Sequence, residues 1–164
     1  MEIRRGRPDD ASELVRLRQV MFVAMGVPGG GAAWQASCEE QLKTGLVDGT
    51  FTAFVADAPT GGLAACGVAT VAQRLPAPGN RSGRSGHVQS MVTDQRFRRQ
   101  GLARAVFVAL MGWFDDQGVD AVDLHATPEG EPLYRSFGFA EADTVELRWA
   151  RRPAQLDPAQ LDNV

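Results

Sequence analysis

A chain of 164 residues, 44% of them hydrophobic and 23% charged, is long enough for one domain with a sizeable core and has an ordinary soluble composition. Its net charge of −3 argues against general nucleic-acid binding, and its apolar runs are too short for a membrane span. No basic start followed by an apolar stretch marks a secretory signal, so we expect a cytoplasmic protein. Cys38 and Cys66 are widely separated and fit neither a disulfide framework nor a metal site.

The chain opens with a short strand over residues 2–5, followed by a helix. Asp10 and Glu13 have the spacing of a capping box, in which Asp10 takes the serine or threonine role. Apolar side chains then recur at helical spacing, at Leu14, Leu17, Met21 and Met25. The pattern predicts a first helix that begins near Asp10.

A glycine-rich loop ends this helix, and a second helix is expected over residues 32–44, ending before Gly45. Residues 50–56 and 63–73 predict an antiparallel strand pair, because turn residues lie between two apolar runs. The stretch 75–86, rich in Pro, Gly and Ser, predicts a long loop.

The second half predicts a strand, a basic turn, a helix and further strands. Residues 88–92 alternate as a strand, and apolar residues then recur every fourth position, at Leu102, Val106, Leu110 and Phe114. This spacing predicts a helix over residues 101–117, followed by an apolar strand over 121–126. Because the helix connects two strands, we expect these strands to be parallel. Residues 144–149 alternate as a final strand.

The turn over residues 98–103 suits a phosphate-bearing ligand. The first turn of a helix has unpaired N–H donors and the positive end of the helix dipole, which together hold an anion. Gly101 and Ala103 would let such a ligand approach the backbone closely. The chain has no P-loop, and no Gly-x-Gly-x-x-Gly turn follows a strand.

This segment resembles the acyl-CoA-binding motif of the GNAT superfamily of N-acyltransferases, Arg/Gln-x-x-Gly-x-Gly/Ala, which is present as Arg98-x-x-Gly101-x-Ala103. A second family pattern, Leu-Tyr-x-x-x-Gly-Phe, is matched by residues 133–139. The two motifs stand at compatible spacing and cover roughly residues 86–140.

The resemblance implies one GNAT-like domain over residues 1–150 and a flexible tail over residues 151–164. The implied fold is mixed α+β, with a central mixed sheet of about six or seven strands flanked by helices. Because many relatives are dimers, a homodimer is the expected assembly.

The resemblance also implies acetyl-CoA (coenzyme A) as the acyl donor and no metal ion. Pantetheine would lie between two splayed parallel strands, on backbone groups of Met91 and Val92. Arg98 and Arg99 would add charge-assisted bonds to phosphate. The pyrophosphate would sit on the loop and helix start, whose residues are Arg98, Arg99, Gln100, Gly101, Leu102, Ala103 and Arg104.

Tyr134, the only tyrosine, falls where many GNAT enzymes place the group that protonates the departing thiolate. A phenol with a pKa near 10 stays protonated at neutral pH and can donate this proton. The alternative is an aromatic residue that packs beside Phe137 and Phe139. The surrounding motif favours the catalytic role.

His87 is the candidate base, since it falls near the position where some relatives carry a glutamate. Equally, His87 could cap the strand or face solvent. His125 on the next strand is better explained as a core or edge histidine. Thr127 replaces an asparagine that is frequent in the family, and it is expected to cap the following helix.

Met25 and Trp34 flank the glycine-rich loop and, with Gln89, are the candidate substrate-binding residues. Ordinary helix-face packing is the alternative for Met25. The implied function is transfer of an acetyl group to a primary amine of a small molecule by direct attack in a ternary complex. Two alternatives are acetylation of protein N-termini or lysine side chains, and a non-catalytic acyl-CoA-binding module.

Overall fold

A computed structural model describes residues 1–27, 31–142, 147 and 149. Its elements, in chain order, are β1 (Ile3–Arg5), η1 (Pro8–Asp10), α1 (Ala11–Ala24), α2 (Ala32–Asp48), β2 (Thr52–Asp57), β3 (Leu63–Gln73), β4 (Arg84–Thr93), η2 (Gln95–Phe97), α3 (Leu102–Asp116), β5 (Ala121–Leu124) and α4 (Glu131–Arg135). This order matches the one expected from the sequence as far as α4. The final strand over 144–149 and the tail over 151–164 fall largely or wholly outside the described residues.

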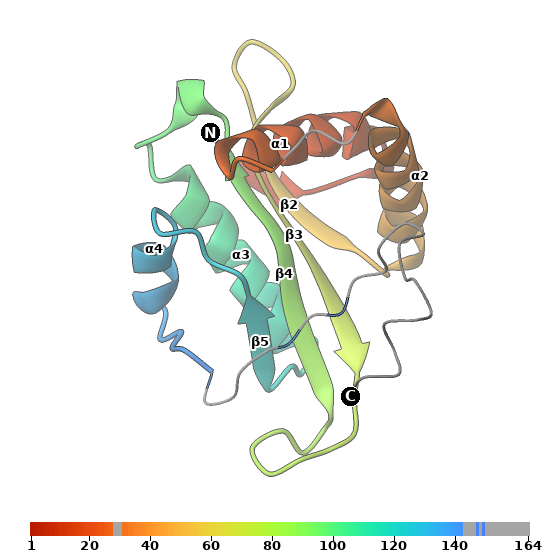
Figure 1. Cartoon of the computed structure of the whole chain (residues 1–164), viewed down its shortest axis with the longest axis vertical. Helices are drawn as coiled ribbons and strands as arrows, with labels where there is room; N and C mark the ends of the chain where they lie inside the picture. The colour runs from red at the N-terminus through yellow and green to blue at the C-terminus, as the bar shows by residue number, and fades with distance from the viewer. Residues whose placement is uncertain (28–30, 143–146, 148, 150–164) are drawn as a thin grey trace, which may run out of the picture.

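The described strands form one five-stranded sheet in the order β1-β2-β3-β4-β5. All neighbours are antiparallel except β4 and β5, which are parallel because α3 crosses over between them. In Figure 1, α1 and α2 lie on one face of the sheet and α3 on the other. The mixed α+β fold predicted from the sequence is therefore confirmed, with five strands in the described part of the chain.

Apolar side chains fill both faces of the sheet. On one face, Leu14 and Leu17 of α1 and Leu42 of α2 pack against Val68 and Val92 of the sheet. On the other face, the buried residues that pack together come from β3, β4, α3 and α4, and they are Ala69, Val88, Phe107, Leu110, Phe114 and Tyr134. Two buried layers hold the central strands on both sides.

The pairing of β4 changes abruptly at Gln89. Ser90 pairs with Val68 of β3 and Val88 pairs with Ala69, so Gln89 is an extra residue that forms a β-bulge. The parallel pairing of β4 with β5 ends at the same place, with Val88 opposite Leu124. Beyond Gln89, β4 remains paired with β3 and has no strand on its other edge among the described residues.

Two local predictions at helix ends were wrong. The second helix continues past Gly45 to Asp48, because Gly45 packs against Phe51: an added Cβ would lie 2.2 Å from the Phe51 ring. Gly49, with φ 84°, ends the helix instead. The Asp10 carboxylate does not cap α1, because it accepts hydrogen bonds from Arg7 N–H (2.7 Å) and from Arg4.

Candidate active site

The unpaired edge of β4 offers free backbone groups. Asp94 N–H donates to the Ala64 carbonyl (2.9 Å), in continuation of the antiparallel ladder. Because backbone groups of successive strand residues point to alternate edges, those of Val92 point toward β3, and those of Met91 and Thr93 point to the open edge. The register thus directs the backbone groups of Val92 to β3, while Met91 and Thr93 have theirs at the open edge.

The loop between β4 and α3 has a conformation that exposes N–H groups. Arg99 has φ 62° and Gly101 has φ 77°, both in the left-handed region that favours glycine. The first hydrogen bond inside α3 runs from Ala105 N–H to the Gly101 carbonyl (3.0 Å). The N–H groups of residues 102–104 therefore have no partner within the helix and point out of its start.

Side chains around this loop leave it open. Arg98, Arg99, Gln100 and Gly101 are exposed, and a Cβ added at Gly101 would meet nothing within 4 Å. Neither Arg98 nor Arg99 forms a side-chain hydrogen bond or ion pair with the described part of the chain. The loop thus has the donors, the positive charge and the space that a pyrophosphate requires.

The Asp94 side chain holds the start of the loop between β4 and α3 in place. Its buried carboxylate accepts hydrogen bonds from Arg96 N–H (3.1 Å), from the Arg96 guanidinium (3.0 Å) and from Arg16 Nη1 (2.9 Å). Arg16 Nη2 also donates to the Leu63 carbonyl (2.8 Å). The Arg96 hydrogen bonds, with those of Arg16, hold the pKa of the Asp94 carboxyl far below its ordinary value. Asp94 is thus part of the turn η2, whose N-cap it forms.

Tyr134 lies beside the open edge of β4. It is 8% exposed, packs edge-to-face on Phe107 (5.2 Å between ring centroids), and lines a cavity of about 150 Å³ with Met91 and Ala103. Burial raises the pKa of the Tyr134 phenol, so the hydroxyl stays protonated at neutral pH. The packing expected from the alternative reading is therefore present, and the place of Tyr134 in the cavity lining is compatible with the catalytic role, which stays a prediction.

The short helix that carries Tyr134 is fixed at both ends. The expectation that Thr127 caps this helix was wrong, because α4 begins after Gly130 and has no side-chain cap. Thr127 Oγ1 instead accepts a hydrogen bond from Gly130 N–H (3.2 Å) in the turn that precedes the helix. Arg104 Nη2 donates to Ser136 Oγ (2.7 Å), and its guanidinium lies 4.9 Å from the centroid of the Phe137 ring. The Arg104 side chain therefore ties α3 to α4, while its N–H remains available at the helix start.

The two histidines lie against each other, with ring centroids 5.8 Å apart. His125 lines the Tyr134 cavity, together with Met25, whereas His87 does not line it. Sequence reasoning ranked His87 above His125 as a base, and the geometry brings His125 to the cavity. The place of His125 in the sequence could have indicated this, because His125 directly follows the last residue of β5, where the pairing of the two parallel strands ends.

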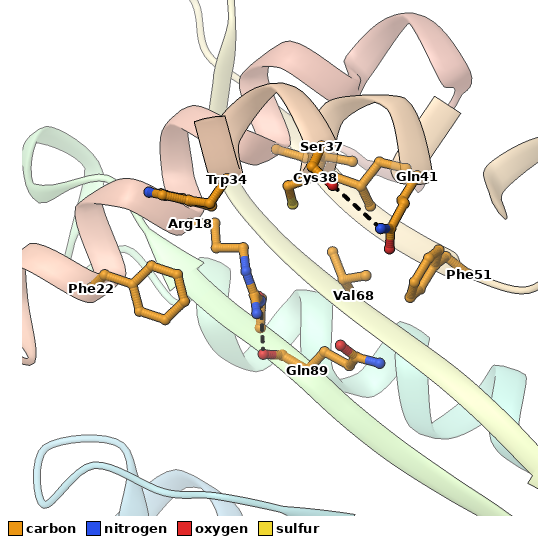
Figure 2. A pocket seen from close by; sticks show the side chains of 12 residues that line it. Arg18, Phe22, Trp34, Ser37, Cys38, Gln41, Phe51, Val68 and Gln89 are labelled. Carbon is orange, nitrogen blue, oxygen red and sulfur yellow. Dashed lines mark hydrogen bonds between the residues drawn. The ribbon is translucent and has the colours of Figure 1, made fainter. Parts of the chain in front are cut away.

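A second, larger cavity of about 430 Å³ lies on the α1/α2 face of the sheet (Figure 2). Trp34 and Gln89 line it, as expected for substrate-binding residues. Sequence reasoning missed Arg18, which also lines this cavity. Leu14, Arg18 and Phe22 lie four residues apart on one face of α1, so a charged residue stands between two apolar ones, and this was the available signal. The Arg18 guanidinium points toward Gln89 in Figure 2.

The two cavities meet at the bulge of β4, since Gln89 and Ser90 line both. A group at the open edge of β4 and a second molecule on the α1/α2 face would therefore reach each other there. The described residues contain no cluster of His, Cys, Asp or Glu that could hold a metal ion, and none of their helices has the length and apolarity of a transmembrane span.

Comparison with known proteins matches this arrangement. A family model for the GNAT acetyltransferase domain matches residues 32–148. Glucosamine 6-phosphate N-acetyltransferase 1 of Oryza sativa subsp. japonica is 36% identical over 85 residues, which are 52% of this chain and 50% of the relative. The chain thus aligns with about half the length of this curated relative.

Solved structures share the whole fold. A GCN5-related N-acetyltransferase from Ralstonia eutropha JMP134 superposes with a TM-score of 0.81 at 25% identity, over 90% of this chain and 97% of that one. A predicted acetyltransferase from Clostridium acetobutylicum, solved with acetyl-CoA, gives 0.80 at 21% identity, over 90% and 95% of the two chains. With the family model covering most of its length, this chain belongs to the GNAT acetyltransferase family.

Proposed function

We propose that this acyltransferase transfers an acetyl group from acetyl-CoA to a primary amine of a small molecule, by direct attack within a ternary complex. The observation that carries the proposal is the meeting of two cavities at Gln89 and Ser90. One cavity lies at the open edge of β4 near Tyr134 and serves as the donor cavity. The other, on the α1/α2 face, serves as the acceptor cavity.

Acetyl-CoA would be held mainly by backbone groups. Met91 and Thr93 direct theirs to the open edge of β4, where the amides of a pantetheine chain could pair with them. The pyrophosphate would sit on the N–H groups at the start of α3, with the Arg98 and Arg99 side chains adding charge. The empty space beside Gly101 fits the close approach that this requires.

Two proton transfers accompany the reaction. Tyr134 would donate its phenolic proton to the departing thiolate, whose pKa near 8.5 lies well below that of the buried phenol. Deprotonating an alkylammonium at pH 7 costs roughly 4–5 kcal/mol, from a pKa near 10.4. We assign this step to the contacting pair His87 and His125, of which His125 lines the donor cavity.

The size of the acceptor cavity favours a small molecule over a protein substrate. Its volume of about 430 Å³ lies within the range typical of small-molecule sites, roughly 300–1,000 Å³. Protein N-terminal or lysine acetylation would rank first only if peptides exceeded small amines by orders of magnitude in kcat/KM. The presence of the Tyr134 phenol in the donor cavity favours a catalytic protein over a module that only binds acyl-CoA.

The test is a calorimetric titration of the purified protein with acetyl-CoA, with desulfo-CoA and ATP as controls. We expect saturable one-site binding of acetyl-CoA that is far tighter than binding of ATP. An amine panel, followed by release of free thiol, then measures transfer. A well-folded protein that binds no acetyl-CoA would refute the proposal.

A further inference from the structure

The acceptor cavity carries a positive charge and no negative one. Among the described residues that line it, Arg18 is the only one with an ionised side chain at neutral pH. The other polar lining groups are neutral amides, hydroxyls and one thiol, from Ser37, Cys38, Gln41, Gln89 and Ser90. A polycationic acceptor would therefore meet repulsion from Arg18 and no compensating carboxylate in this lining.

Arg18 is held in place and keeps donors to spare. Its Nη1 donates to Ser90 Oγ and to the Gln89 carbonyl (3.2 Å). Its guanidinium lies 5.0 Å from the centroid of the Phe22 ring. These contacts orient the planar group, while Nε and Nη2 donate to no other described residue. A guanidinium fixed in this way is prepared to bind a carboxylate or a phosphate.

The remaining lining side chains of the acceptor cavity are hydrocarbon or aromatic. Phe22 and Trp34 meet edge-to-face with ring centroids 5.4 Å apart near Arg18, and Phe51 lines the opposite end of the cavity, beyond Val68 (Figure 2). Such a wall gains free energy by covering hydrocarbon or the apolar face of a ring. The cavity thus combines one cationic anchor with an apolar surface.

We infer that the acceptor is a primary amine that also carries an anionic group, a carboxylate or a phosphate, which Arg18 binds while an apolar part of the molecule covers Phe22 and Trp34. This inference rests on the proposed function. Because Arg18 contacts the two residues at which the cavities meet, the anion would be anchored next to the transfer site. The amine would then project toward the donor cavity.

Matched acceptor pairs test the inference on the wild-type protein. L-phenylalanine is compared with phenethylamine, which lacks the carboxylate, and glucosamine 6-phosphate with glucosamine, which lacks the phosphate; spermidine is the polycation. We expect the anionic member of at least one pair to exceed its neutral partner at least tenfold in kcat/KM. The pair that responds identifies carboxylate or phosphate as the anion. Equal rates within both pairs, or spermidine as the best acceptor, would overturn the inference.

Arg18→Met then isolates the anchor, with Arg18→Lys to retain the charge and Arg81→Met as the matched control. Arg81 lies on the exposed loop between β3 and β4 and does not line the acceptor cavity. We expect R18M to lower the anionic-to-neutral ratio of kcat/KM at least tenfold, mainly through KM. R18K should keep part of the ratio and R81M all of it. Comparing ratios cancels the differing amine pKa values, since every variant meets the same acceptors.

A purely structural role for Arg18 gives a different result. Loss of its contacts to Ser90 and Gln89 would then lower both members of a pair equally and leave the ratio unchanged, which would refute the inference. Calorimetric acetyl-CoA affinity of each variant verifies that the donor cavity remains intact. Turnover without anion preference contradicts only the inference, whereas no turnover with any amine contradicts the proposed function as well.

Discussion

At the scale of single residues, the Tyr134 hydroxyl is the group whose removal tests the chemistry most directly. Tyr134→Phe keeps the ring that packs on Phe107 and deletes only the proton donor. We expect acetyl-CoA affinity to stay unchanged and kcat to fall at least tenfold, since general acids contribute about 10²–10⁴-fold. Calorimetry measures the affinity, and thiol release at saturating substrate measures kcat. Unchanged turnover would remove Tyr134 from the mechanism.

Gly101 is the residue at which bulk and charge should matter most for the donor. Its φ of 77° and its open surroundings place a new side chain at the helix start that we assign to pyrophosphate. Gly101→Glu should abolish acetyl-CoA binding, because the new carboxylate would occupy the position of the pyrophosphate and repel its negative charge. Gly79→Glu is the matched control, since Gly79 also has a positive φ (86°) and nothing within 4 Å. A folded G101E protein that binds normally would contradict the cofactor assignment, provided G79E binds normally too.

At the scale of elements, the turn η2 and the ends of β3 and β4 depend on one buried carboxylate. Asp94→Asn removes the charge that receives hydrogen bonds from Arg16 and Arg96. Hydrogen bonds to charged groups contribute about 1.5–3 kcal/mol, so we expect the free energy of unfolding to fall by about 2 kcal/mol at pH 7. Urea unfolding of wild type and D94N measures the difference. Asp116→Asn, at an exposed position near the end of α3, controls for the loss of one negative charge.

The pH dependence of this difference has a definite sign. The folded-state pKa of Asp94 lies below the unfolded value of about 3.9, so its contribution is complete above that pH and is lost as the pH falls through the folded pKa. The asparagine side chain of the D94N variant does not titrate. The stability gap between wild type and D94N should therefore be constant from pH 5 to 7 and shrink below about pH 4. A gap that widens in acid would show that Asp94 is not ionised in the folded protein.

Sequence patterns predicted the elements well where periodicity and turn chemistry determine them. The strand over residues 63–73 agrees with β3, and the helix over 101–117 agrees with α3 to within a residue at each end. The bulge at Gln89 had no such signal, because nothing in the alternation of residues 88–92 marks an extra residue. Its position depends on register against β3, a tertiary property, and that register is also the reason why we propose Thr93 and not Val92 as a backbone partner.

At the scale of the whole molecule, sequence motifs marked the proposed donor side, whereas the lining of the acceptor cavity was predicted only at Trp34 and Gln89. The Arg98-to-Ala103 loop and Tyr134 lie in two short motifs that carry their chemistry in consecutive residues. The acceptor cavity draws instead on α1, α2, β3 and β4, and its residues come together only through packing. Arg18 is the clearest case, since a lone arginine on a helix is usually solvated and only the fold places it beside Gln89 and Ser90.

The joined cavities bear on the kinetic mechanism, because direct attack and a ping-pong reaction use them differently. A ping-pong reaction needs a nucleophile that accepts the acetyl group before the amine binds. The two cysteines are poor candidates, since burial raises the pKa of the Cys38 thiol and raises that of Cys66 to about 12, which leaves both protonated at neutral pH. The proposed direct attack instead requires both substrates to be bound together, as the shared residues Gln89 and Ser90 allow.

We therefore expect double-reciprocal plots at several acetyl-CoA concentrations to intersect. Protein incubated with acetyl-CoA alone, then desalted, should gain no acetyl group by intact mass spectrometry. Parallel lines together with an acetylated protein that passes its acetyl group to an added amine would require a covalent intermediate. That result would contradict direct attack while leaving the donor site in place, because acetyl-CoA must bind in either mechanism. The outcome thus depends on how the two cavities are used, and the cavities meet at the bulge in β4, beside the point where the pairing with β5 ends.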